Sequence, residues 1–161
     1  MCYNIKWKSH RAVLFLDPYG MEVKWSTIEK VSKTAAIDMW YLFPLSVNRL
    51  LRKDGIIPEE DQKRLSELFG TDDWYNEFYL TNYVNNLFEE ETETIEKIGD
   101  FNKISRYIVK RLKTAFPGVA KNPLALYNSK QNPLFLFCFA CSNKKGSPVA
   151  LKIAEHILKG L

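Results

Sequence analysis

One short segment combines residue types that could do chemistry. Asp17-Pro18-Tyr19-Gly20 directly follows the apolar run Ala12–Leu16. A carboxylate and a proline carbonyl can each accept a hydrogen bond from an amino group, and an aromatic ring can stack on the planar face of the same molecule. This combination is typical of a methyltransferase-type pocket for a flipped base or another planar amine. Asp17, Pro18 and Tyr19 are therefore candidate catalytic residues.

The same four residues also suit a plain turn at the end of a strand. Asp17 can cap a backbone amide, Pro18 fixes its own φ angle, and Gly20 can adopt a positive φ. The sequence by itself leaves both interpretations open.

The elements around this segment would place it at the edge of a sheet. The apolar run predicts a strand buried on both faces over residues 12–17, which Pro18 and Gly20 end. We expect a helix that begins with Ser26 as its N-cap and Glu29 as the second residue of a capping box. A second strand should follow over residues 37–44. In such a βαβ unit the two strands are parallel. Their carboxyl ends then share the edge where ligands bind in open α/β sheets.

Four more residues are candidates for substrate binding: Gly20, Trp25, Asn48 and Arg49. Trp25 either flanks the pocket or staples the helix to the sheet. Asn48 and Arg49 follow the second strand, so we expect them near Asp17 at the same edge. Arg49 either contacts a phosphate or lies on a solvated helix face.

The rest of the chain predicts a single α/β domain over residues 1–161, with a partial Rossmann-like sheet of about four strands. Residues 1–10 are an arm or an edge strand, and residues 46–116 are an inserted helical segment. Within that segment we expect a helix capped by Gly70, an aromatic-rich helix from Asp72, and an acidic run, Glu89–Glu93, on a solvated helix face or loop. A hairpin over residues 124–127 and 134–141 precedes a final helix whose buried stripe includes Ile153 and Ile157.

Composition restricts the class of protein. With 46% hydrophobic and 26% charged residues the chain is typical of a soluble globular protein. No apolar run approaches the ~20 residues of a membrane span, and the N-terminus has no apolar signal region, so we expect a cytoplasmic protein with no membrane contact. The net charge of +4 permits nucleic-acid binding without requiring it. We interpret the basic residues over 103–113 by default as the solvated face of a helix.

The pair Cys138 and Cys141 matches a Cys-x-x-Cys pattern. It lies in an apolar run that predicts a strand, where residues three apart point to opposite faces. We therefore expect two buried thiols rather than a metal or redox site.

Several blocks of the chain resemble the three-Cys-motif partner protein (TcmP) family. They are Arg11–Gly20, Trp25–Ile28, Lys33–Asp38, Leu42–Leu45, Asn48–Leu51, Phe69–Gly70, Trp74–Tyr75, Pro133–Phe137 and Asn143–Ala150. The resemblance covers nearly the whole chain in order. The family is bacterial and phage-associated.

This resemblance implies a class I methyltransferase-related Rossmann fold, with Asp17-Pro18-Tyr19 at the place of a catalytic Asp-Pro-Pro-Tyr motif. Here the motif has one proline rather than two. The resemblance also implies an upstream half with a glycine-rich loop for S-adenosylmethionine, but only ten residues precede Arg11 and none is glycine. We therefore expect a C-terminal portion with no cofactor of its own, while a full-length protein would hold S-adenosylmethionine.

A sheet without its upstream strands would expose the apolar strand 12–16 as an edge, and such edges pair with other strands. We expect a homodimer through Ala12–Leu16, or coverage of that edge by Met1–Lys8. A three-Cys-motif protein and nucleic acid are the other expected partners. The alternative to a methyltransferase-like fragment is a non-catalytic interaction module that binds a partner protein or nucleic acid in a phage or mobile-element system.

Overall fold

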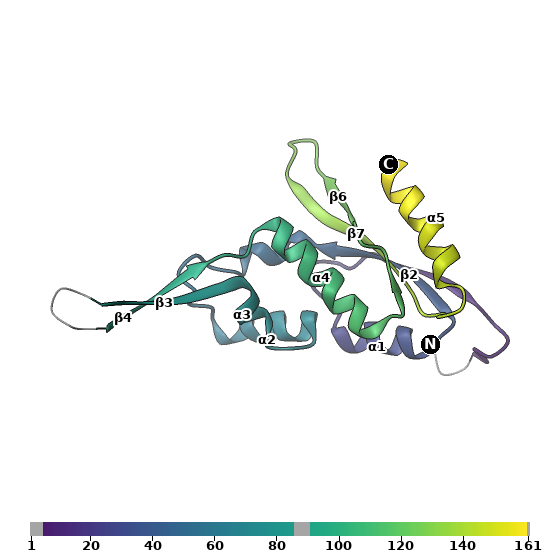
Figure 1. The fold of residues 1–161 in the computed structure, drawn as a ribbon, viewed down its shortest axis with the longest axis horizontal. Coiled ribbons are helices and arrows are strands. Elements are labelled where there is room, and N and C mark those ends of the chain that lie inside the picture. The colour runs from purple at the N-terminus through teal and green to yellow at the C-terminus, as the bar shows by residue number, and fades with distance from the viewer. Residues whose placement is uncertain (1–4, 86–90, 161) are drawn as a thin grey trace.

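A mixed sheet forms the centre of the structure, a computed structural model that describes residues 5–85 and 91–160 (Figure 1). Its strands run in the order β1 (Ala12–Leu16), β2 (Ile37–Pro44), β7 (Pro133–Cys141) and β5 (Gly118–Val119), and β6 (Leu124–Tyr127) also pairs with β7. β1 and β2 are parallel, whereas β7 is antiparallel to β2, β5 and β6. The α/β class is confirmed. In the described residues this sheet has the four predicted strands and the two-residue β5 in addition.

α1 (Trp25–Lys33) connects the parallel strands β1 and β2, and its residues Ile28 and Val31 are buried. The register pairs Leu14 with Met39, so β1 and β2 end at the same edge of the sheet. The predicted capping box at Ser26 is wrong. The helix begins at Trp25 with Lys24 as its N-cap, and no side chain caps it.

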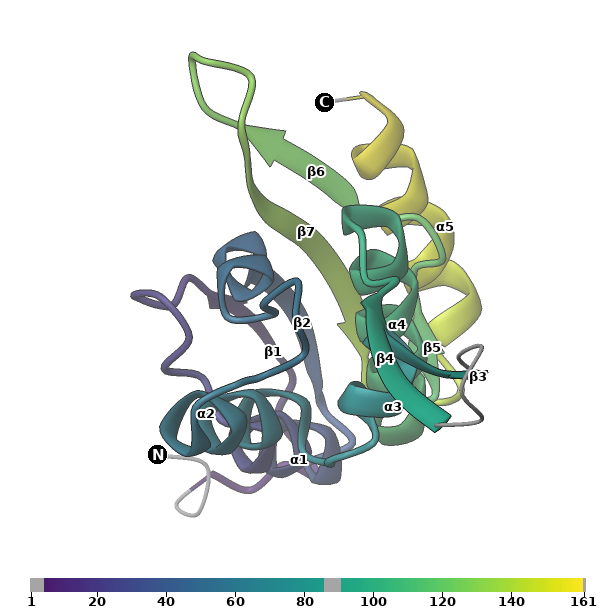
Figure 2. The same ribbon diagram turned by 90° about the vertical axis from the view of Figure 1, so that its left-hand side faces the viewer.

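Three helices cover one face of the sheet: α1, α2 (Glu59–Phe69) and α4 (Phe101–Ala115) (Figure 2). A cluster of aromatic rings joins α2 and α4 to β2 and to the short α3 (Trp74–Phe78). Ring centroids lie between 5.0 and 5.8 Å apart in the pairs made by Phe43, Phe69, Phe78 and Tyr107. The main core therefore lies between this face and the helices.

The opposite face is only partly covered. α5 (Ser147–Gly160) packs Ala154 and Leu158 against Phe139 and Cys141 of β7. Ile153 and Ile157, which the sequence placed in the buried stripe, are 57% and 39% exposed. The predicted buried stripe was too wide, because only a narrow side of α5 packs against the sheet.

Residues 46–116 are not wholly helical, which corrects the predicted insertion. A two-stranded hairpin, β3 (Tyr79–Asn85) and β4 (Glu91–Lys97), projects away from the other elements (Figure 1). The helix expected from Asp72 is only the five-residue α3, and the segment begins with the short 3-10 helix η2 (Leu45–Arg49). Of the acidic run, 91–93 begin β4, while Glu89 and Glu90 lie outside the described residues. The β-branched residues Thr92, Thr94 and Ile95 favour this strand over a helix.

β1 is an edge strand rather than a strand buried on both faces. Val13 and Phe15 are 71% and 56% exposed, while Leu14 and Leu16 pack against the main core. Among the described residues only β2 pairs with it. Residues 5–10 form turns and not an edge strand, and Trp7 packs against the main core. The first four residues of the expected Met1–Lys8 cover lie outside the described chain.

The helices in the described part of the chain are all too short or too polar to span a membrane.

Candidate functional site

The segment Asp17–Gly20 lies immediately beyond the carboxyl end of β1. Asp17 is exposed, and Tyr19 is 88% exposed, so one face of its ring is open to a ligand. Gly20 has a φ of 62°, in the left-handed region that favours glycine. A Cβ at Gly20 would meet nothing within 4 Å, so the backbone conformation, and not crowding, is what favours glycine here.

Tyr19 and Gly20 line a surface hollow of about 460 Å³ that extends to α2. The charged groups from α2 are already paired. Glu67 Oε2 lies 3.0 Å from Lys24 Nζ, and Arg64 Nη2 lies 2.6 Å from Glu60 Oε1. The hollow therefore offers an exposed aromatic ring beside groups of both signs, and Asp17 lies two residues before that ring.

Trp25 lies in the core and not at this hollow. Its side chain is 4% exposed, and the guanidinium carbon of Arg111 lies 4.7 Å from its ring centroid. On another side the ring is so close to Gly70 that a Cβ there would lie 2.1 Å from Trp25 Cδ1. The indole ring is thus occupied by packing between α1, α4 and the end of α2.

Asn48 contacts the β3–β4 hairpin. The Lys97 ammonium donates to the Asn48 carbonyl at 3.3 Å, to Asn48 Oδ1 at 2.9 Å and to the Leu51 carbonyl at 2.6 Å. Burial, and next the nearby Lys53 charge, lowers the pKa of Lys97. Asn48 also lines a different hollow, of about 570 Å³, beside Lys97 and Phe101.

Arg49 is exposed at the end of η2 and lines neither of these hollows. Of the candidate residues, Tyr19 and Gly20 line the hollow beside α2, and Asp17 and Pro18 directly precede them in the chain without lining it. Trp25 and Asn48 have other surroundings.

The two described cysteines lie on opposite faces of β7. Cys138 belongs to the main core and Cys141 packs under α5. Burial raises the pKa of Cys138 to about 12 and that of Cys141 to about 11, so both thiols stay protonated and unreactive near neutral pH. Across 5–85 and 91–160 there is no cluster of three or more His, Cys, Asp or Glu side chains that could hold a metal ion.

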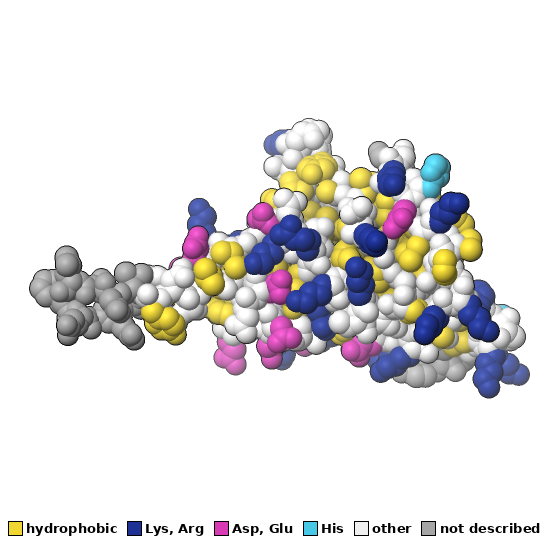
Figure 3. Space-filling model, viewed as in Figure 1, with side chains coloured by type: hydrophobic (Ala, Val, Ile, Leu, Met, Phe, Trp, Pro, Cys, Tyr) yellow, Lys and Arg dark blue, Asp and Glu magenta, His cyan; other side chains and the backbone are white. Residues whose placement is uncertain are grey.

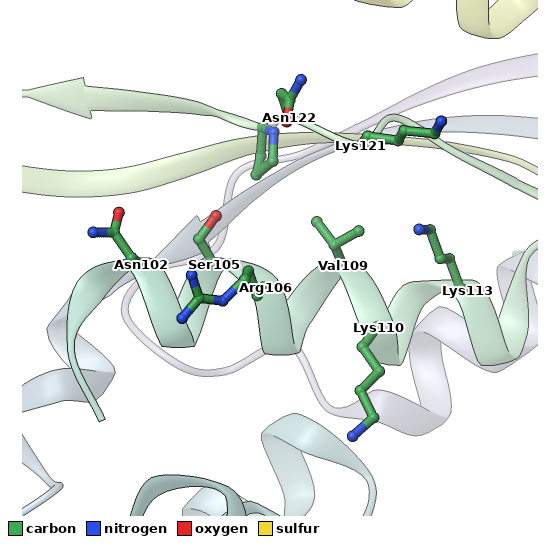
Figure 4. Close-up of a pocket in the computed structure, with 9 residues that line it drawn as sticks. Asn102, Ser105, Arg106, Val109, Lys110, Lys113, Lys121 and Asn122 are labelled. Atoms are coloured by element: carbon green, nitrogen blue, oxygen red, sulfur yellow. The ribbon is translucent and has the colours of Figure 1, made fainter. Parts of the chain in front are cut away.

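A basic groove of about 410 Å³ was not predicted from the sequence. It lies between α4 and the connection from β5 to β6 (Figure 4), on a face where Lys and Arg side chains gather over α4 (Figure 3). The basic residues over 103–113 were the one feature of the sequence that could have indicated this groove. The other wall, Lys121–Pro123, reaches α4 because β5 pairs with β7, and spacing along the chain does not reveal that pairing.

Comparison of the chain with family models, with curated proteins and with solved structures found no match. The assignment of a site therefore depends on the residues and their geometry.

Proposed function

We propose that the chain is a methyltransferase-like unit of the three-Cys-motif partner type, whose Asp17-Pro18-Tyr19 turn holds a planar, amino-bearing substrate. The strand order is the observation that carries this proposal. Two parallel strands, the first ending in Asp-Pro-Tyr, are followed in the sheet by antiparallel β7 and then by β5 and β6. A methyltransferase-related Rossmann sheet is likewise parallel except for one strand inserted near its end.

The chemistry of the turn supports recognition of an amine. The Asp17 carboxylate accepts one hydrogen bond from the amino group, and the Pro18 carbonyl accepts the second. Proline holds its φ near about −65°, which limits the directions this carbonyl can take. The exposed Tyr19 ring stacks on the planar face. A nucleobase with an exocyclic amino group has this combination of features.

S-adenosylmethionine would supply the methyl group in such an enzyme. The residues present do not fit it, because the turn from β1 to α1 contains one glycine, Gly20, and no two of the seven glycines form a Gly-x-Gly pattern. We assign no cofactor residues in this chain and derive no transfer step. Calorimetric titration with S-adenosylmethionine should show no binding at micromolar concentration, and micromolar binding would contradict this assignment.

The substrate class is tested by titration with adenosine, whose planar base carries an exocyclic amino group. We expect the NMR signals of the Tyr19 ring to shift progressively as adenosine is added, because the base stacks on the exposed ring. Unchanged Tyr19 signals up to the solubility limit of adenosine would overturn the proposed site.

The second candidate function is a non-catalytic interaction module, which the edge strand favours. β1 has no second neighbour in the described residues, and Val13 and Phe15 are largely exposed beside that edge. Uncovered strand edges pair with other strands, so a second copy of this chain or a three-Cys-motif protein is the expected partner.

Sedimentation equilibrium tests the form of this candidate in which two copies pair. The unaltered chain should be dimeric, and Val13→Lys should be monomeric because a charge on the strand disfavours pairing. Lys63 is exposed on α2 and away from β1 in the chain, so Lys63→Gln serves as a surface control. A monomeric unaltered chain would exclude the homodimer.

A further inference from the structure

The groove beside α4 has a lining that differs from that of the hollow at Tyr19. Side chains of Ser105, Val109 and Lys113 point from α4 toward the segment that carries Lys121 and Asn122 (Figure 4). The polar and charged lining residues are Asn102, Ser105, Arg106, Lys110, Lys113, Lys121 and Asn122. No acidic residue lines the groove.

The basic residues of α4 divide into two groups. The side chain of Lys110 lines the groove but points away from Lys121 and Asn122 (Figure 4). Its ammonium is paired with Glu77, with 3.1 Å between Nζ and Oε2. Arg111 donates from Nε to the Phe69 carbonyl at 2.8 Å. In contrast, Arg106 and Lys113 are exposed and form no ion pair within the described chain, and the same holds for Lys121 across the groove. Three cations that line one groove are thus available to bind an anion.

The lining also restricts what that anion is. A volume of about 410 Å³ is large enough for a small molecule, but such sites are mostly apolar and aromatic, whereas only Val109 and Pro123 are apolar here. No aromatic ring lines the groove, so it offers no surface for base stacking. Guanidinium, ammonium, amide and hydroxyl donors together are the groups that bind phosphate oxygens.

From these observations we propose that the groove binds the phosphate backbone of a nucleic acid, without reading its sequence. The inference goes beyond the amine-binding turn and does not depend on it. Lys103 is a further basic residue of α4 that does not line the groove and forms no ion pair within the described residues, so cationic side chains extend beyond the groove, which suits a row of phosphates better than one isolated phosphate. Because phosphate contacts fix position and carry no sequence information, we expect little dependence on base sequence.

Fluorescence anisotropy with a labelled single-stranded oligonucleotide and its duplex tests the groove. Lys113→Gln and Lys121→Gln should each weaken binding about 3- to 10-fold, and each should reduce the slope of log K against log salt by about 1 between about 50 and 200 mM salt. Lys152→Gln and Lys159→Gln remove the same charge from exposed positions on α5 and should change affinity by less than about twofold. All four positions are exposed, so the variants should fold normally.

Three results would overturn the proposal: no binding, binding without salt dependence, or equal losses in the groove variants and the α5 variants. The last result would mean that net charge alone attracts the polymer. Competition separates the two sources of phosphate. If inorganic phosphate displaces the oligonucleotide at an equal concentration of phosphate groups, the groove is a site for a small phosphate ligand and the nucleic-acid proposal fails.

Discussion

Gly20 and Gly70 share a backbone conformation but not an environment. Their φ angles are 62° and 70°, both in the left-handed region. A Cβ would meet open space at Gly20, whereas at Gly70 it would lie 2.1 Å from Trp25 Cδ1. Conformation alone therefore favours glycine in the candidate site, while conformation and close packing together require it at the end of α2.

Replacing each glycine with alanine separates these two effects. Gly20→Ala should cost about 1–2 kcal/mol of unfolding free energy, which is the cost of the left-handed conformation. Gly70→Ala should cost at least about 3 kcal/mol, because Trp25 must also move. Urea unfolding monitored by fluorescence measures both, and equal losses would contradict the packing described for Trp25.

The sequence predicted the role of Gly70 but not that of Trp25. Gly70 was predicted as the cap of α2, and it is the left-handed C-cap, because a helix end depends only on nearby residues. The place of Trp25 was left open between packing and binding. Its neighbours Gly70 and Arg111 come from distant segments, so residue type and spacing did not decide between the two.

At the scale of elements, Lys97 joins the β3–β4 hairpin to η2. Its ammonium donates to carbonyl oxygens of Asn48 and Leu51, which are backbone acceptors at and after the end of that helix. Lys97→Met keeps the length of the side chain but leaves these acceptors without their donor. The free energy of unfolding should fall by about 1–3 kcal/mol.

Lys63→Met is the matched control, because Lys63 is exposed on α2. Hydrogen exchange should also become faster over residues 48–53 in Lys97→Met and remain unchanged in Lys63→Met. If both variants unfold at the same urea concentration and exchange alike, Lys97 does not anchor the hairpin.

The elements that could be predicted from the sequence have short-range signals. β1, β2, β6 and β7 follow apolar runs that end in turn residues, and α4 and α5 follow helical spacing. β4 was missed because it is rich in acidic residues, although Thr92, Thr94 and Ile95 favour a strand. β3 has no acidic residue and its Tyr79, Thr81, Tyr83 and Val84 favour a strand, but it directly follows the aromatic-rich segment that was expected to be a helix. β5 is two residues long and depends on its pairing with β7.

At the scale of the whole molecule, Asp38 should link stability to pH. It is half-buried near the amino end of β2, opposite Val13. Burial raises the pKa of Asp38, and the Arg11 charge opposes this only in part. The folded chain therefore holds this proton to higher pH than the unfolded chain. The contribution of Asp38 to stability is full below its ordinary pKa of 3.8 and is lost as the pH rises through the folded value.

Asp38→Asn removes this penalty. The melting temperature should exceed that of the unaltered chain at about pH 7, and the difference should disappear below the ordinary carboxyl pKa. Glu29→Gln, on the exposed side of α1, should leave the melting temperature unchanged at both pH values. A difference for Asp38→Asn that does not vary with pH would show that packing, and not ionisation, is its cause.

The candidate turn and the basic groove differ in how far apart along the chain their residues lie. The predicted parallel β1–α1–β2 unit places the Asp17 turn at the carboxyl edge, and that part follows from local patterns. The exposed faces of β1 and α5 and the basic groove arise from how distant elements pack, which patterns along the chain do not contain. The turn could therefore be identified from the sequence, whereas the groove could not.

The central claim is that Asp17 recognises the amino group of a planar base. The most direct test compares binding of adenosine with binding of inosine, which has a carbonyl in place of that amino group, using NMR titration of Tyr19. The unaltered chain and a Glu29→Ala control should prefer adenosine by about 3- to 10-fold, and Asp17→Ala should bind both nucleosides equally. An unaltered chain without this preference, or an Asp17→Ala variant that keeps it, would contradict the account.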